Sequence, residues 1–314
     1  MSASSGRHPA HRRFGWAGFL LEVPQSYRLV QVAENGRRGK LSLADDERVR
    51  LELAWDTAVR RRMDPQRVAR RCLFRATGKR LKRSHRDKIE PISLPALTCM
   101  FRYRHEETRC DHYAGFSART NRFVRLACHL GDDDKNDQSQ LFERQILPSL
   151  QDQPPDRPQA WAFFGVQFNA PAGLVYEESR LNLGDMRVMF VASDRRSRLT
   201  IGCIYPAKLA LSRQPLDQWM RQILKAEHKR FRRCGEGNFS EIAAPCGRGL
   251  DAESHLRWVL LLWPWRRMRV RQTWLIHDAG SDRLVLLQAT GRREELQALL
   301  DQAAKGLCGK DISC

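Results

Sequence analysis

The sequence lacks the short motifs that mark the common enzyme classes. It has no G-x-S-x-G nucleophile elbow, no G-x-G-x-x-G after a strand, and only an isolated Gly-Lys at residues 78–79 in place of a P-loop. Residues 131–134 (GDDD) lack the ligand spacing of an EF-hand, and residues 253–255 (ESH) are too local for a catalytic triad. We therefore expect a protein that is not an enzyme and uses no cofactor.

Paired cysteines are also missing. The nine cysteines are odd in number and none of them forms a C-x-x-C motif, which is typical of reduced thiols in a cytoplasmic protein. Cys110, His112 and Cys128 could meet across a hairpin as metal ligands, but the second half of the chain does not repeat them. We expect cysteines that are buried or at strand edges, and no metal site.

Long apolar runs are absent as well. The run at residues 258–263 is far too short to span a bilayer. Near the start of the chain, two arginines precede an apolar stretch that loosely resembles a signal peptide, yet Glu22 and Pro24 follow it without a small-residue cleavage site. We interpret residues 16–23 as the first strand of the fold.

Negative charge is scarce relative to positive charge. The chain has 36 Asp and Glu against 55 Lys and Arg, which gives a net charge of +19 and a pI near 10.2. Such an excess favours anionic partners, namely nucleic acid, acidic protein surfaces or anionic lipid. Most basic residues are Arg, so compositional bias in the source genome is the alternative explanation. Apolar residues at 42% are sufficient for a packed core.

The sequence contains an internal repeat, whose two copies lie about 150 residues apart. The strand-like segments 18–24 (GFLLEVP) and 165–171 (GVQFNAP) correspond, and so do the alternating segments 49–53 (VRLEL) and 197–201 (SRLTI). A proline then begins a helix in each half, at Pro65 and at Pro215. The apolar stripe of the second helix consists of Leu216, Trp219, Met220, Ile223 and Leu224.

Each half continues with a hairpin and a closing helix. The hairpins are predicted at residues 112–128 and 273–289, and the closing helices at 140–150 and 293–307. We therefore predict an α+β fold of two tandem repeats, each a largely antiparallel sheet with helices packed against it. The predicted divisions are a flexible basic arm (1–13), repeat 1 (14–150), a Pro-rich linker (151–160), repeat 2 (161–308) and a C-terminal tail (309–314).

This order of elements resembles two tandem PsbP/Mog1-like α/β/α sandwich domains. The opening strands, the VRLEL and SRLTI strands and the Pro-started helices carry the resemblance, which covers residues 14–150 and 161–308. The resemblance implies non-catalytic domains that bind other macromolecules. It places no site residues, because the sequence contains no diagnostic motif of that family.

Basic residues follow one face of both predicted helices, at intervals of three to four positions. Nine of them lie between positions 67 and 86, and positions 65–86 include no acidic residue. The predicted anion-binding residues are Arg71, Arg75, Lys79, Arg80, Lys82 and Arg83 in the first half and Arg221, Lys225, Lys229, Arg230, Arg232 and Arg233 in the second. The alternative is a solvated face, part of which offsets the helix macrodipole.

A second basic element alternates with aromatic residues near position 265. Its residues are Arg266, Arg267, Arg269 and Arg271. Aromatic and arginine side chains in this pattern either stack bases and hold phosphates or form a core face with an exposed Arg row. We predict a cytoplasmic binding protein that engages an anionic macromolecule, with nucleic acid as the first expectation. The alternative is a protein-interaction scaffold that binds an acidic protein surface.

Overall fold

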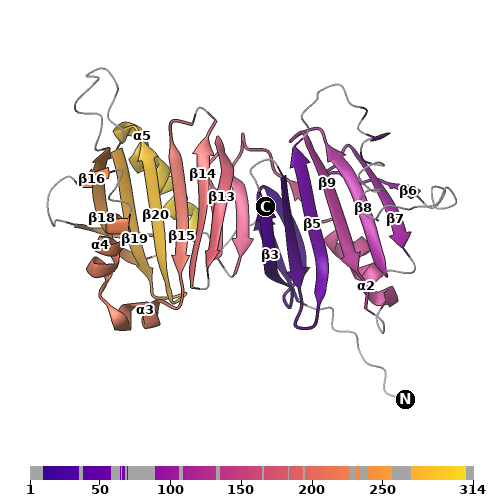
Figure 1. Ribbon diagram of the computed structural model, residues 1–314, viewed down its shortest axis with the longest axis horizontal. Helices are drawn as coiled ribbons and strands as arrows, with labels where there is room; N and C mark the ends of the chain where they lie inside the picture. Colours follow the sequence, from indigo (N-terminus) through magenta and orange to yellow (C-terminus); the bar gives the residue numbers. More distant parts are fainter. Residues whose placement is uncertain are drawn as a thin grey trace, which may run out of the picture. The chain divides into compact units, whose positions relative to one another are not determined.

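A computed structural model describes residues 10–34, 38–57, 64, 66–67, 69, 89–105, 109–131, 135–164, 166–182, 184–193, 195–226, 231–233, 239–245, 247–256 and 270–308. The chain divides into two compact units (Figure 1). The first unit comprises residues 1–154 and 161–165, and the second comprises residues 155–160 and 166–314. No single position therefore separates the two units, because residues 155–160 of the second unit precede residues 161–165 of the first.

The first unit contains a seven-stranded antiparallel sheet in the order β3-β4-β5-β9-β8-β7-β6 (Figure 1). The strands are β3 (Arg28–Glu34), β4 (Arg38–Ala44), β5 (Val49–Thr57), β6 (Ile89–Ile92), β7 (Cys99–His105), β8 (Cys110–Ser117) and β9 (Arg122–His129). Alternation in β5 buries Leu51 and Leu53 on one face and leaves Glu52 on the other. Because Leu53 is paired with Leu126 of β9, the apolar row continues across the sheet.

A hairpin covers part of this buried face. It consists of β1 (His11–Trp16) and β2 (Phe19–Pro24), which pair with each other and with the short strands β11 (Gln159–Phe163) and β10 (Gln151–Asp152). Residues 16–23, predicted as one strand, are thus a hairpin with a turn at Ala17 and Gly18, both at positive φ (52° and 82°). His11 to Arg13, predicted as part of a flexible arm, lie in β1.

The closing helix of the first unit lies next to the same sheet face. It begins as α2 (Lys135–Leu141) and continues as the single π-helical turn η2 (Phe142–Ile146). Phe142 and Ile146 are buried, and the ring of Phe142 packs on Tyr113 of β8 with centroids 5.0 Å apart. The predicted closing helix at 140–150 therefore exists, but it begins five residues earlier and ends four residues earlier than expected.

The second unit contains an antiparallel sheet in the order β13-β14-β15-β20-β19-β18-β16, with β17 paired to β18 (Figure 1). The strands of this unit are β12 (Val166–Ala170), β13 (Leu174–Asn182), β14 (Asp185–Ala192), β15 (Arg198–Ile204), β16 (Phe231–Arg233), β17 (Ser240–Ala244), β18 (Gly247–Leu256), β19 (Val270–Asp278) and β20 (Arg283–Gly291). The order β13-β14-β15-β20-β19-β18 is the same as the order β3-β4-β5-β9-β8-β7 in the first unit.

Helices pack on both faces of the second sheet. The helices are α3 (Ala207–Arg213), α4 (Leu216–Ala226) and α5 (Arg293–Cys308). Met220 and Ile223 of α4 pack with Leu275 of β19, which confirms the apolar stripe predicted for this helix. Gln272 of β19 contacts Gln297 of α5. Because positions 272 and 275 of a strand point to opposite faces, α4 and α5 lie on opposite sides of the sheet.

The predicted fold class, an α+β fold of two repeats with helices packed against each sheet, is wrong. Strand residues far outnumber helical residues in the described part of the chain, and the strands form three sheets. In the first unit, the β1–β2 hairpin provides cover that helices were expected to provide, and the ring of Phe19 packs on Trp55 with centroids 5.5 Å apart. Large aromatic side chains on a short hairpin bury enough apolar surface to replace a helix.

Candidate functional site

Most of the predicted anion-binding residues lie outside the described residues. These are Arg71, Arg75, Lys79, Arg80, Lys82 and Arg83 of the first half, Lys229 and Arg230 of the second half, and Arg266, Arg267 and Arg269 of the second basic element. For them the binding face stays a prediction. Residues 66, 67 and 69 are helical, and Ala69 is fully buried against Phe101 and Ala114 of the sheet.

On α4, Arg221 and Lys225 are exposed on the outer face, as predicted from the helical spacing. Arg221 Nη2 lies 3.5 Å from Asp217 Oδ2 one turn earlier, and its guanidinium lies 5.7 Å from the ring centre of Phe239. An exposed pair of this kind contributes less than about 1 kcal/mol, so Arg221 can still turn toward a partner.

The structure separates the other described members of the predicted face. Arg232 and Arg233 were placed on the α4 helix face, but they belong to strand β16, where Arg232 pairs with His255 of β18. The helical placement of these two residues is therefore wrong. Arg271 lies on β19, and its Nε donates to Thr290 Oγ1 at 3.3 Å, so this side chain is partly engaged within the sheet.

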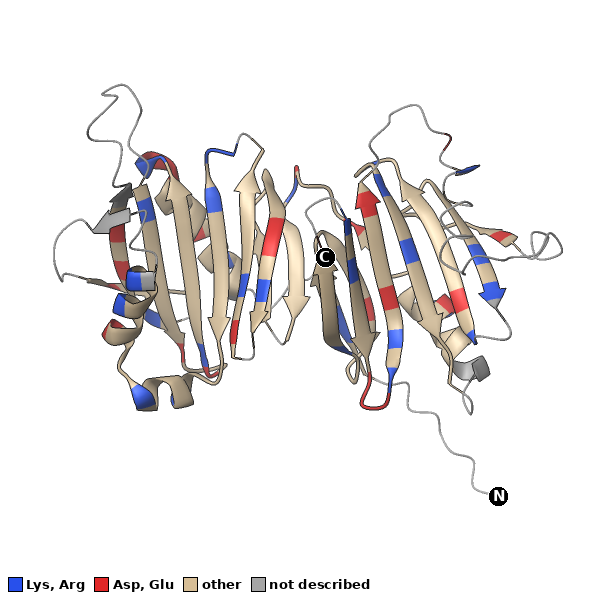
Figure 2. Cartoon of the chain, in the orientation of Figure 1, with Lys and Arg blue, Asp and Glu red and all other residues tan. Residues whose placement is uncertain are grey.

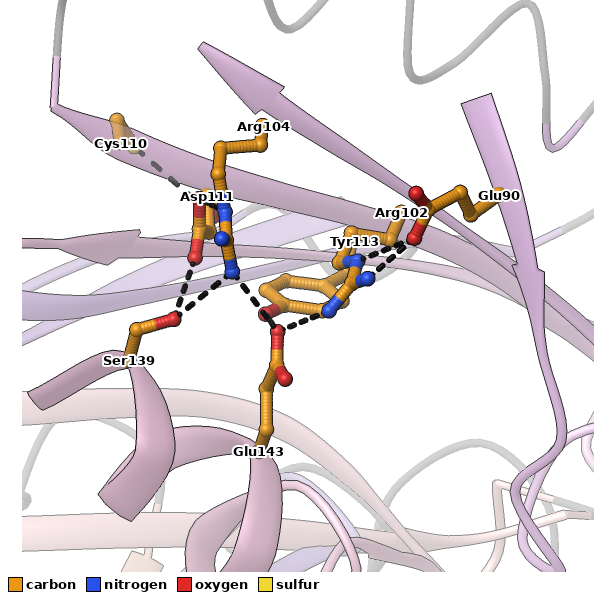
Figure 3. Close-up of polar contacts among 8 residues, drawn as sticks. All are labelled: Glu90, Arg102, Arg104, Cys110, Asp111, Tyr113, Ser139 and Glu143. Carbon is orange, nitrogen blue, oxygen red and sulfur yellow. Dashed lines mark hydrogen bonds and ion pairs between the residues drawn. The ribbon is translucent and has the colours of Figure 1, made fainter. Parts of the chain in front are cut away.

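The described residues bring together a polar cluster that sequence reasoning did not single out. Arg102 is paired with Tyr113, and Arg104 with Asp111, across β7 and β8, so all four side chains lie on one face. Figure 3 shows this face meeting Ser139 and Glu143 of the closing helix. We name these six residues, together with Glu90 of β6, the β7–β8 cluster.

Glu143 is the acceptor at the centre of the β7–β8 cluster. Its Oε1 accepts hydrogen bonds from the Tyr113 hydroxyl at 3.2 Å, from Arg104 Nη2 at 3.4 Å and from Arg102 Nη1 (Figure 3). Glu143 lies in the π-helical turn, a rare element that is frequent at functional or strained positions. Three donors on one oxygen hold this turn against the sheet.

Asp111 is almost completely buried, at 1% exposure, and both of its carboxylate oxygens are occupied. Arg104 Nε donates to Oδ1 at 3.1 Å, and the Ser139 hydroxyl donates to Oδ2 at 3.0 Å. The same Ser139 oxygen accepts from Arg104 Nη2 at 3.1 Å. Each polar atom of Asp111 therefore has a partner, as a buried carboxylate requires.

The surroundings of Arg102 and Tyr113 shift the pKa of each of these two side chains. Partial burial tends to lower the pKa of Arg102, but its bonds to Glu90 and Glu143 outweigh burial and raise that pKa. Burial, reinforced by the negative charges of Asp111 and Glu143, raises the pKa of Tyr113. Both groups therefore remain hydrogen-bond donors at neutral pH. General acid–base chemistry needs a group that titrates near the working pH, and neither of these two does.

The thiols near the cluster are poor nucleophiles. Burial raises the pKa of Cys110 to about 12, and it also raises the pKa of Cys128. The strand register also separates the three candidate metal ligands. Cys128 lies opposite Asp111, whereas Cys110 and His112 point to the other face of the sheet. Among the described residues, no group of three His, Cys, Asp or Glu side chains is arranged to hold a metal ion.

The second unit places a polar cluster at the corresponding position with the charges exchanged. Asp251 of β18 is paired with Trp274 of β19, and Glu253 with Gln272. Gln272 Nε2 donates to Asp251 Oδ2 and to Gln297 Oε1 of α5, both at 3.0 Å. Arg293 Nη2 of α5 donates to Glu253 Oε2 at 3.2 Å. Here β18 carries the acids and the helix the base, whereas in the first unit β7 carries the bases Arg102 and Arg104 and the helix carries the acid Glu143.

A buried ion pair ties the hairpin to the first sheet. Asp152 lies in β10, within the segment predicted as a linker, and accepts hydrogen bonds from Arg122 of β9 and from Thr120. Arg122 Nη1 also donates to the backbone oxygen of Ala17 in the hairpin turn at 2.6 Å. Burial lowers the pKa of Arg122, and the carboxylate of Asp152 acts in the opposite direction.

Comparison with known proteins gives little further guidance. No family model matches the chain, and no curated protein sequence matches it. Among solved structures, the apo immunity protein TplEi of the T6SS from Pseudomonas aeruginosa aligns with 94% of this chain and 95% of its own, at 11% identity and a TM-score of 0.33. A likeness at this level carries no argument, and the PsbP/Mog1-like resemblance stays a prediction. No helix among the described residues is long and apolar enough to cross a membrane.

Proposed function

We propose that the protein is a non-catalytic binding module whose partner is a protein with an acidic surface. The observation that carries this proposal is the state of the β7–β8 cluster. Its carboxylates Asp111 and Glu143 already accept hydrogen bonds from Arg102, Arg104, Tyr113 and Ser139. Groups that are held in this way stabilise a scaffold.

The overall charge supports an acidic partner. The chain carries a net charge of +19, whereas many described cations on the sheets are paired with carboxylates of the same unit. Lys40 Nζ lies 2.7 Å from Glu52, and Arg38 Nε lies 3.1 Å from Asp56. Figure 2 shows basic and acidic positions interspersed along the strands of both units. A surface of mixed sign with a positive excess suits a shaped protein partner better than a uniform phosphate backbone.

The sheet edges support docking through side chains rather than through an added strand. The edge strands β3 and β13 each carry a register shift, at Val30 and at Glu177, and the edge strand β6 contains Pro91. Bulges and prolines at an edge discourage pairing with a foreign strand. A partner is therefore expected to contact loops, helices or sheet faces.

Affinity purification tests the proposal. The tagged full-length chain is recovered from its source cells after nuclease treatment, and retained proteins are identified by mass spectrometry. The proposal requires an acidic protein that survives nuclease and binds again when both purified components are mixed, with an affinity that falls as salt rises. Recovery of nucleic acid alone, or of no partner that rebinds after purification, would contradict it.

Nucleic acid is a second candidate, which rests on the nine basic residues between positions 67 and 86. Binding through about six phosphates would give a log–log salt slope of about −5. Filter binding to a single-stranded and a double-stranded oligonucleotide at several salt concentrations measures this slope. A flat salt response, or unchanged binding after Arg71, Arg75, Lys79 and Arg83 are replaced by Glu, would exclude this candidate.

A further inference from the structure

We draw no further inference here: the strongest candidate, the polar side-chain cluster in which Gln272 of β19 joins Asp251 of β18 to Gln297 of α5, rests only on the raised pKa of the Asp251 carboxyl group, which identifies neither a ligand nor a partner.

Discussion

Arg102 of the first unit and Asp251 of the second occupy corresponding register positions and carry opposite charges. Arg102 lies opposite Tyr113, and Asp251 lies opposite Trp274, each beside the closing helix of its own unit. The closing helix supplies an opposite charge to each strand: Glu143 of η2 binds Arg102, whereas Arg293 of α5 binds Glu253, two residues from Asp251. Each closing helix is therefore matched by charge to its own sheet, which disfavours packing on the sheet of the other unit.

Removal of the Glu143 carboxylate should destabilise the first unit. Glu143→Gln leaves the guanidinium groups of Arg102 and Arg104 with one charge partner fewer in a half-buried place. We expect a loss of about 1–3 kcal/mol in the free energy of unfolding, measured by urea denaturation. The control is Glu90→Gln, because the Glu90 side chain is 59% exposed and should cost less than about 1 kcal/mol. Equal costs for the two variants would contradict the central role of Glu143.

The ion pair between Arg122 and Asp152 should be a stronger determinant of stability. The side chains are 13% and 0% exposed, so Asp152→Ala leaves an arginine without its charge partner in a nearly dry site. Breaking such a pair costs about 3–5 kcal/mol. Urea denaturation of this variant should show that loss, whereas Asp156→Ala, at an exposed position of the same segment, should unfold like the unmodified chain.

The elements with a local sequence pattern could be predicted, whereas the long-range ion pairs could not. The hairpin β19–β20 and the helix α4 follow from local alternation and helical spacing, and they were predicted within a few residues. The β7–β8 cluster could not be predicted, because Glu143 is 41 residues from Arg102 and no local pattern links them. An Arg-x-Arg pair on a strand is usually a solvated edge, and only the register with Asp111 identifies it as internal.

The β1–β2 hairpin could not be predicted from the sequence for a different reason. Hairpin turns are normally recognised by Asn-Gly or Asp-Gly, and here the turn is Ala17-Gly18, with the alanine at a φ of 52°. Apolar residues continue through the turn without interruption, so the sequence reads as one strand. The contact of Phe19 with Trp55 and the bond from Arg122 to Ala17 O fix the turn, and both are long-range.

Asp251 should make the stability of the second unit depend on pH. Burial raises its pKa in the folded state, although the hydrogen bond from Gln272 acts in the opposite direction. A carboxyl group whose folded pKa is raised binds its proton more tightly when folded, so stability falls as pH rises from below the unfolded pKa through the folded pKa. Asp251→Asn should therefore raise the thermal midpoint at pH 7 and have little effect near pH 3. A lower midpoint for the Asn variant at pH 7 would contradict this sign.

The buried thiols should resist alkylation in the native protein. Burial raises the pKa of Cys110 to about 12 and that of Cys203 to about 11. The higher pKa lowers the thiolate fraction at a given pH about a thousandfold for Cys110 and about a hundredfold for Cys203, and burial restricts access further. Mass spectrometry after iodoacetamide treatment should show slow modification of both residues at pH 7.5 and complete modification in denaturant. Fast native labelling of Cys110 would show that the β8 strand end opens readily.

Gly39 is required by the aromatic ring that lies over it. Gly39 of β4 is the cross-strand partner of Trp55, and a Cβ at this position would lie only 2.1 Å from the Trp55 ring. The ring cannot move away freely, because it is buried and packs on Phe19. Gly39→Ala should therefore lower the free energy of unfolding by about 1–3 kcal/mol. Gly280→Ala is the matched control, since its Cβ would meet Asp278 Oδ1 at an ordinary 3.4 Å. Urea denaturation gives the free energy of unfolding of both variants. Equal values for Gly39→Ala and the control would mean that the β1–β2 hairpin does not hold the Trp55 ring against β4.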